Sequence, residues 1–243
     1  MNNAIVVIPT YNEKENAEAI IRKVFSLAVP FDVLIVDDDS PDGTAAIVKN
    51  LQTEFPDRLF LEERQGKLGL GTAYIHGFKY ALAHGYDYIF EMDADFSHNP
   101  EDLIRLYEAC SQEGYDVAIG SRYIKGVNVV NWPMNRVLMS YFASYYVRLI
   151  TGMPIQDATA GFKCYTRKVL ETIPLDEIKF IGYAFQIEMK FLAYKYGFKI
   201  KEVPIIFTDR TKGESKMSKG IIQEAFYGVI RMKVDSYFRH FNR

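Results

Sequence analysis

Tyr88-Ile-Phe-Glu-Met-Asp93-Ala-Asp95-Phe-Ser97-His-Asn-Pro100 carries the strongest fold signal in this 243-residue sequence. Apolar residues lead up to Met92, two aspartates follow with one residue between them, and a proline restarts the chain. The pattern predicts a buried strand that delivers Asp93 and Asp95 into a crevice, because ligands of open α/β sheets bind outside the carboxyl ends of the strands. Two carboxylates at this spacing can hold one hard cation that keeps sites free for diphosphate oxygens. The alternative is a polar turn in which Asp95 or Ser97 caps the next helix.

Strand and helix patterns alternate five times over the first 120 residues or so. This alternation is typical of a single doubly wound, mostly parallel sheet that is flanked by helices. Besides the stretch above, short apolar runs predict strands at 4–8, 33–36, 58–61 and 116–120. Helical spacing of apolar residues predicts helices at about 17–25, 45–51, 71–81 and 101–113.

Length and composition set limits on the class of protein. With 243 residues, of which 49% are hydrophobic, the chain can bury a full core, and we expect one domain over 1–243. A net charge of −2 without a basic block argues against a nucleic-acid partner. The two cysteines, Cys110 and Cys164, lack metal-ligand spacing, which favours a reduced compartment. Because the sequence shows neither a signal segment nor a spanning apolar run, we expect a cytoplasmic protein, soluble or peripheral to a membrane.

Polar residues collect at the predicted strand ends in the first half of the chain, residues 1–123. Such a set offers an aromatic face for a base, carboxylates for ribose or base donors, and an arginine for phosphate. The glycine series Gly66-x-x-Gly69-x-Gly71 follows the third strand and does not match the dinucleotide-binding pattern. Together these features predict a nucleotide-binding half. Its strand-end residues are Tyr11, Glu13, Asp38, Asp93, Asp95 and Arg122.

The second half, residues 124–243, loses the alternation. The segment 134–150 is apolar along one side, with Arg136 and Arg148 near its ends, and suits a helix lying in a membrane interface or docked on the sheet edge. Residues 157–162 predict a flexible loop, 184–196 a helix, and 199–207 a strand. The basic segment 209–219 is either a mobile phosphate clamp or a solvated loop. A final amphipathic helix over 221–241 could pack on its own domain, on a partner or on anionic lipid.

Taken together, eight motifs resemble the inverting family-2 glycosyltransferases, and among them the polyprenyl-phosphate (dolichyl-type) mannose synthases. The resemblance covers nearly the whole chain and implies a GT-A-type fold. The motifs are Ile8-Pro-Thr-Tyr-Asn-Glu13, Val36-Asp-Asp-Asp-Ser-Pro-Asp-Gly-Thr44, Lys67-Leu-Gly-Leu-Gly-Thr-Ala-Tyr74, Met92-Asp-Ala-Asp-Phe-Ser-His98, Gly120-Ser-Arg-Tyr123, Asn131-Trp-Pro133, Asp157-Ala-Thr-Ala-Gly-Phe162 and Asp209-Arg-x-x-Gly-Glu-Ser-Lys216.

The resemblance also implies roles for individual residues. The guanosine end of the donor is assigned to Pro9, Tyr11, Glu13, Val36 and Asp38. The diphosphate and a Mg²⁺ or Mn²⁺ ion are assigned to Asp93, Ala94 and Asp95, with Asp93 and Asp95 as the metal ligands. Donor phosphates or the acceptor are assigned to Arg122, Arg210 and Lys216. The acceptor lipid phosphate is assigned to Arg122, Arg136 and Ser140, and the catalytic set is Asp93, Asp95 and Arg122.

Two positions depart from the pattern. Ser97 stands where archaeal relatives carry a glutamine that is a further metal ligand, and Ala160 stands where the loop commonly has serine. Many relatives continue into transmembrane helices, which this sequence lacks, so a membrane-anchoring subunit or an amphipathic surface is the expected attachment. The four histidines are scattered, and His98 is expected at the surface or as a cap.

The implied reaction is inverting, metal-dependent transfer of mannose from GDP-mannose to a polyprenyl phosphate, which gives a β-linked product. Since a phosphate monoester has a second pKa of about 6, the acceptor is already ionised and needs no protein base. Two alternatives stay open. One is a related enzyme that uses UDP-glucose or UDP-GlcNAc on a lipid phosphate or a glycan. The other is a non-catalytic subunit that only binds a nucleotide sugar.

Overall fold

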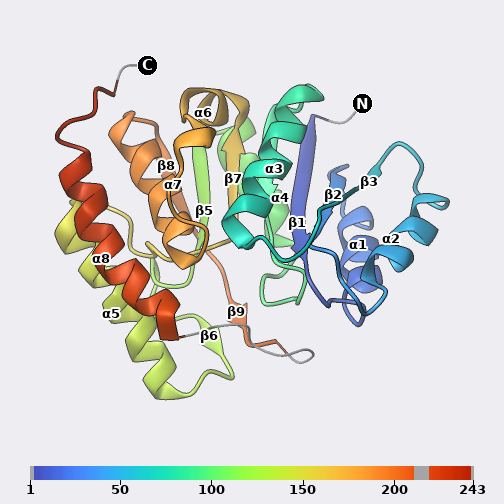
Figure 1. Cartoon of the computed structure of the whole chain (residues 1–243), viewed down its shortest axis with the longest axis horizontal. Helices are drawn as coiled ribbons and strands as arrows, with labels where there is room; N and C mark the ends of the chain where they lie inside the picture. Colours follow the sequence, from blue (N-terminus) through green and yellow to red (C-terminus); the bar gives the residue numbers. More distant parts are fainter. Residues whose placement is uncertain (1–2, 211–218, 242–243) are drawn as a thin grey trace.

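The computed structural model describes residues 3–210 and 219–241 of the chain. A central seven-stranded sheet lies between two layers of helices (Figure 1). The sheet order is β3-β2-β1-β4-β7-β5-β8, so β1 and β4 lie in its middle. The strands are β1 (Ala4–Thr10), β2 (Asp32–Asp37), β3 (Leu59–Glu63), β4 (Tyr88–Glu91), β5 (Val117–Ser121), β7 (Lys163–Thr166) and β8 (Ile200–Pro204).

The predicted doubly wound, mostly parallel sheet is confirmed. Strands β1, β2, β3 and β4 pair in parallel, as do β5 and β8. The sequence prediction missed β7, which returns from the second half of the chain and pairs antiparallel with both β4 and β5. Strand β7 thus lies between β4 and β5, which would be neighbours if the strands of the alternating strand–helix pattern simply followed one another in the sheet.

Helices cover both faces of the sheet, and successive residues of β1 point into the two layers. Ile5 and Val7 belong to the core under α3 and α7, whereas Val6 and Ile8 belong to the core under α1, α2 and α4. A strand that is buried on both faces appears in the sequence as a continuous run of apolar residues. The helices are α1 (Ala17–Phe25), α2 (Thr44–Gln52), α3 (Leu70–Ala83), α4 (Asp102–Ser111), α5 (Met134–Thr151), α6 (Arg167–Thr172), the 3₁₀ helix η1 (Leu175–Glu177), α7 (Tyr183–Lys195) and α8 (Lys219–Asp235).

A close helix–strand contact brings α3 onto the middle of the sheet. A Cβ atom at Gly77 would lie only 2.4 Å from Cγ1 of Val7 on β1, so this position requires glycine. One turn earlier on α3, Tyr74 therefore reaches the loop that follows β4, where its hydroxyl lies 3.3 Å from an Asp93 carboxylate oxygen.

The C-terminal half differs from the sequence prediction in two places. The strand expected over 199–207 is interrupted: β8 ends at Pro204, and β9 (Phe207–Thr208) pairs in parallel with β6 (Val129–Val130) in a separate small sheet. The last helix ends at Asp235 rather than near 241. In the basic segment, residues 211–218 lie outside the described residues, and so does the predicted phosphate ligand Lys216. Of the helices in the described ranges, none is long and apolar enough to cross a bilayer.

Candidate active site

The two aspartates lie just beyond the C-terminal end of β4, as predicted. Asp95 is buried, and its Oδ1 accepts a hydrogen bond from the backbone N–H of Ser97 at 3.0 Å. Its Oδ2 lies 2.9 Å from Nη2 of Arg210. Helix α4 has Glu101 at its N-cap, without a side-chain capping hydrogen bond. The alternative interpretation, in which Asp95 or Ser97 caps the next helix, is therefore wrong.

The environment of Asp93 suits a bound cation. Burial and the negative charge of Asp95 raise the pKa of the Asp93 carboxyl to about 7, so ionising both groups is costly without a positive charge nearby. Oxygen ligands of this kind are those that hard divalent ions prefer. Within the described ranges, no group of three or more His, Cys, Asp or Glu side chains could hold a metal ion. The two aspartates fit a metal that takes its remaining ligands from a bound donor.

His98 supports the loop that carries these aspartates. Its Nδ1 accepts the backbone N–H of Asp93 at 3.4 Å, and its ring stacks on Phe162 with centroids 4.9 Å apart. The side chain is buried, so the expectation of a surface position is wrong. Burial lowers the pKa of His98 to about 4, which keeps the imidazole neutral near pH 7.

The predicted guanosine residues gather where β1 and β2 end side by side. Pro9 is the register partner of Val36 in the parallel pair. Just beyond β1, the ring of Tyr11 lies under Nζ of Lys67, 4.6 Å from the ring centroid, and Glu13 is buried and accepts an amide hydrogen bond. The structure thus brings the residues predicted to bind the donor base together at one edge of the sheet.

Arg64 is a residue of this edge that the sequence prediction missed. Its Nε donates to Oδ1 of Asp38 at 2.7 Å, and its Nη1 donates to Thr72 at 2.9 Å, so it joins β2 to α3. Asp38 also accepts the backbone N–H of Leu68 at 3.1 Å. Arg64 directly follows β3, and the strand-end rule that identified Asp38 would have identified it too.

Arg122 follows β5 and forms a buried, two-pronged ion pair with Asp157. The distances are 2.7 Å from Nε to Oδ2 and 2.7 Å from Nη2 to Oδ1, and Nη2 also donates to Thr159 at 2.9 Å. The Arg122 guanidinium holds the pKa of Asp157 below its ordinary value despite burial. The loop 157–162, predicted to be flexible, is instead largely buried and joined to Arg122.

The two arginines predicted to bind the acceptor phosphate lie against Trp132. The guanidinium carbons of Arg122 and Arg136 lie 5.5 Å and 4.1 Å from the centre of its ring. Arg136, on α5, also forms an ion pair with Asp209 at 2.9 Å, and Ser140 follows one turn later on the same helix. The two predicted arginines therefore share one aromatic surface, which Trp132 provides.

A second group of residues that sequence reasoning missed is a buried polar cluster beneath the aspartate loop. Glu91 on β4 lies 3.0 Å from Nζ of Lys163 on β7, and it accepts a 2.7 Å hydrogen bond from Gln186 on α7. Lys190, also on α7, donates to the backbone carbonyl of Ala160 at 2.5 Å. Burial lowers the pKa of both lysines. The charged Glu91 inside an apolar strand was the sequence signal for this cluster.

Comparisons with known proteins complete the description of the site. A family model described as "Glycosyl transferase family 2" matches residues 5–173. The chain is 47% identical over 225 residues to polyprenol monophosphomannose synthase from Mycolicibacterium smegmatis, covering 93% of this chain and 84% of that protein. It is 44% identical over 227 residues to undecaprenyl-phosphate mannosyltransferase from Micrococcus luteus, covering 93% of this chain and 92% of that protein.

Two solved structures share the fold at low sequence identity. Glucosyl-3-phosphoglycerate synthase from Mycobacterium tuberculosis, solved with Mn²⁺, UDP and glucosyl-3-phosphoglycerate, aligns with a TM-score of 0.68 at 16% identity, covering 96% of this chain and 79% of that chain. The mannosyltransferase PcManGT from Pyrobaculum calidifontis, solved with GDP-Man and Mn²⁺, aligns with a TM-score of 0.56 at 16% identity, covering 96% and 73%.

Proposed function

Because the chain belongs to glycosyl transferase family 2 and has the GT-A fold, we propose that it transfers mannose from GDP-mannose to a polyprenyl phosphate with inversion. The observation that carries the proposal is the identity of 47% and 44%, over 93% of the chain, to two proteins named for mannosyl transfer to a polyprenyl phosphate. The product is a polyprenyl-phosphate β-mannose. Residues 1–123 form most of the donor site and residues 124–243 most of the acceptor side, with Arg122 and Arg210 as the exceptions.

The donor binds beyond the C-terminal ends of β1, β2 and β4. The guanosine lies against Pro9, Tyr11, Glu13, Val36 and Asp38, the residues gathered at that edge. Asp93 and Asp95 would hold a Mg²⁺ or Mn²⁺ ion, which would supply charge stabilisation to the departing diphosphate. The Arg210 guanidinium lies 2.9 Å from the Asp95 carboxylate. When the donor binds, Arg210 pairs with a donor phosphate in place of this carboxylate.

The acceptor phosphate binds on the Trp132 side of the site. Arg122, Arg136 and Ser140 orient it, and the two guanidinium groups offset the repulsion between two approaching anions. A phosphate monoester is largely ionised near pH 7, so its oxygen attacks the anomeric carbon without a protein base. With its pKa lowered to about 4 and its Nδ1 accepting the Asp93 N–H, His98 is a weak base, and the proposed reaction assigns it no proton transfer. One in-line displacement inverts the α-linked sugar of the donor.

A panel of radiolabelled donors tests the choice of sugar and base. We expect label to pass to a short polyprenyl phosphate from GDP-mannose, and not from UDP-glucose or UDP-GlcNAc, when Mg²⁺ or Mn²⁺ is present. Transfer from a UDP sugar would favour the related-enzyme alternative. Donor binding without any transfer would favour the non-catalytic subunit.

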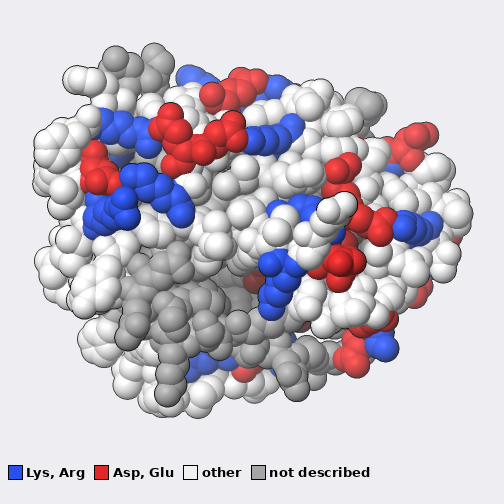
Figure 2. Space-filling model, viewed as in Figure 1, with Lys and Arg blue, Asp and Glu red and all other residues white. Residues whose placement is uncertain are grey.

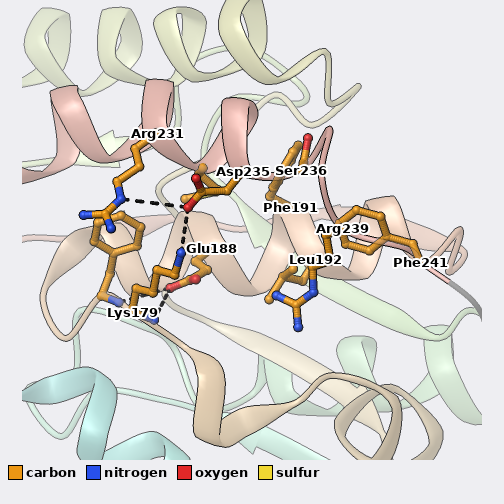
Figure 3. Close-up of a pocket in the computed structure, with 11 residues that line it drawn as sticks. Lys179, Glu188, Phe191, Leu192, Arg231, Asp235, Ser236, Arg239 and Phe241 are labelled. Atoms are coloured by element: carbon orange, nitrogen blue, oxygen red, sulfur yellow. Dashed lines mark hydrogen bonds and ion pairs between the residues drawn. The ribbon is translucent and has the colours of Figure 1, made fainter.

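An apolar surface on α5 and α8 supports attachment to a membrane. The helices lie side by side (Figure 1), and the ring of Tyr146 stacks on that of Phe226 with centroids 4.7 Å apart. Figure 2 shows few charged side chains at the lower left edge, over α5. At the C-terminal end of α8, Asp235 forms an ion pair with Lys179 at 2.6 Å (Figure 3). The exposed apolar residues are Met134, Leu138, Met139, Tyr141, Phe142, Tyr145, Leu149, Phe226, Tyr227, Ile230, Val234, Tyr237 and Phe238.

We propose that this surface rests on the cytoplasmic face of a membrane, where the lipid acceptor resides. The double variant Phe142→Asp and Leu149→Asp should lower binding to phosphatidylcholine–phosphatidylglycerol vesicles roughly tenfold or more, since each apolar side chain contributes about 1–2 kcal/mol when buried. Both side chains are at least 60% exposed, so folding should be unaffected.

Vesicle flotation measures this binding. The matched control is Asn50→Asp with Gln112→Asp, which adds the same charge at exposed positions on and beside other helices. Equal flotation of both double variants and the wild type would contradict lipid docking and favour a membrane-anchoring subunit as the partner of this surface.

A further inference from the structure

The loop that holds Arg122 is fastened at both of its ends by charged side chains, of which Glu202 is partly buried and Lys190 fully buried. At its start, Glu202 on β8 accepts the backbone N–H groups of Gln156 at 2.7 Å and Asp157 at 2.9 Å. At its end, the carbonyl of Ala160 accepts a hydrogen bond from Lys190 at 2.5 Å. Between these ends, the Asp157 carboxylate accepts two hydrogen bonds from the Arg122 guanidinium. The direction of Arg122 therefore depends on where this loop lies.

Lys190 is an unusual residue for its surroundings. It is 0% exposed, and its amine donates a hydrogen bond to the backbone carbonyl of Ala160. Lys163, also fully buried, lies 3.5 Å from the same oxygen but is chiefly engaged with Glu91 and Gln186. Burying an ammonium group is costly, and an apolar residue of the same size would often be as stable or more so. Stability alone thus gives no reason for a lysine here.

We infer that Lys190 is a positioning residue for the acceptor phosphate: by holding Ala160 it fixes the loop through which Asp157 and Thr159 aim Arg122. This rests on the proposed function, in which Arg122 binds the attacking phosphate. A small displacement of a group that orients a reacting anion lowers the rate steeply, since a shift of about 1 Å can cost about 100-fold.

Trp132 offers a readout that does not depend on activity. It is the only tryptophan in the chain, and the Arg122 guanidinium carbon lies 5.5 Å from its ring centre. A change in the position of Arg122 should change both the emission of Trp132 and its quenching by acrylamide. A role of Lys190 in global stability alone would leave both properties of the folded protein unchanged.

The test compares Lys190→Met with Lys195→Met, a lysine on the same helix that does not contact the loop. Methionine preserves the volume and removes the charge, so we expect Lys190→Met to fold, as circular dichroism and thermal melting can verify. We expect altered Trp132 emission and quenching, and a loss of roughly tenfold or more in kcat/KM for polyprenyl phosphate. Lys195→Met should match the wild type in both.

A double-mutant cycle with Arg122→Lys separates positioning from general damage. If Lys190 acts through Arg122, Lys190→Met should lower kcat/KM little further once Arg122 is replaced. The inference would be overturned if the losses of kcat/KM in the two single variants were fully additive in the double variant. It would also be overturned if Lys190→Met matched the wild type in both Trp132 fluorescence and kcat/KM. If the wild type transfers no mannose, the proposed function fails, while the fluorescence comparison still decides whether Lys190 positions Arg122.

Discussion

Replacing Asp95 by asparagine should lower kcat for mannosyl transfer by about three orders of magnitude. The carboxylate is proposed to hold the cation that stabilises the departing diphosphate, a contribution of several kcal/mol. Loss of about 4 kcal/mol corresponds to about a 1,000-fold slower reaction. Asparagine keeps the shape of the side chain and an oxygen that can accept the Ser97 N–H, now 3.0 Å from Oδ1, so the loop should persist.

Steady-state transfer of radiolabelled mannose at saturating Mg²⁺ or Mn²⁺ measures the effect. The matched control is Asp176→Asn, which removes a charge at a side chain that is 84% exposed and far from the site in the fold, on η1. Turnover of Asp95→Asn within a few-fold of the wild type would remove Asp95 from the metal site, whatever the control shows.

Asp157→Asn should destabilise the protein and also disable the acceptor side. Asp157 is 0% exposed and forms both prongs of its ion pair with Arg122. Removing one partner of such a pair leaves a buried charge without its counter-charge, at a cost of about 3–5 kcal/mol. For a chain of this length, that corresponds to a fall in melting temperature of roughly 10 °C. Transfer should fall as well, because Arg122 loses the group that directs it.

The pH dependence of this stability loss has a defined sign. Arg122 lowers the pKa of Asp157 in the folded protein, so the ionised pair stabilises the fold above the unfolded-state pKa of about 4. That contribution is lost as the pH falls from there through the folded-state pKa. Urea unfolding should therefore give a constant difference between wild type and Asp157→Asn from about pH 7 to pH 5, and a shrinking one below about pH 4.

A difference in stability that stays the same at every pH would show that the asparagine acts through packing rather than through the lost charge. Asp176→Asn again provides the control. Its side chain is solvent-exposed, and exposed ion pairs contribute little, so its unfolding curve should follow the wild type throughout.

Local sequence pattern was enough to predict the parallel strands and the position of the aspartate pair. Strands such as β1 are apolar throughout because both faces are covered, and that run is visible without any structure. Helix α5 was also predicted closely, since Pro133 stands at its N-cap and its polar residues mark its ends. The gathering of Tyr11, Asp38 and Asp95 at one edge then follows from the rule for strand ends.

The features that were missed depend on contacts between distant parts of the chain. Strand β7 has four residues and includes the buried Lys163, so nothing local marks it as a strand in the middle of the sheet. Lys190 lies in a helix whose sequence pattern does not set this lysine apart. Its hydrogen-bond partner is a backbone carbonyl 30 residues earlier in the chain.

The most direct measurement is the identity of the lipid product. The protein is incubated with GDP-mannose, Mg²⁺ and a short polyprenyl phosphate, and the extracted lipid is analysed by mass spectrometry and NMR. We predict one added hexose, β-linked to the phosphate, with about 1,000-fold slower formation by Asp95→Asn. A lipid that stays unmodified with the wild-type protein, or an α-linked product, would contradict the proposed reaction.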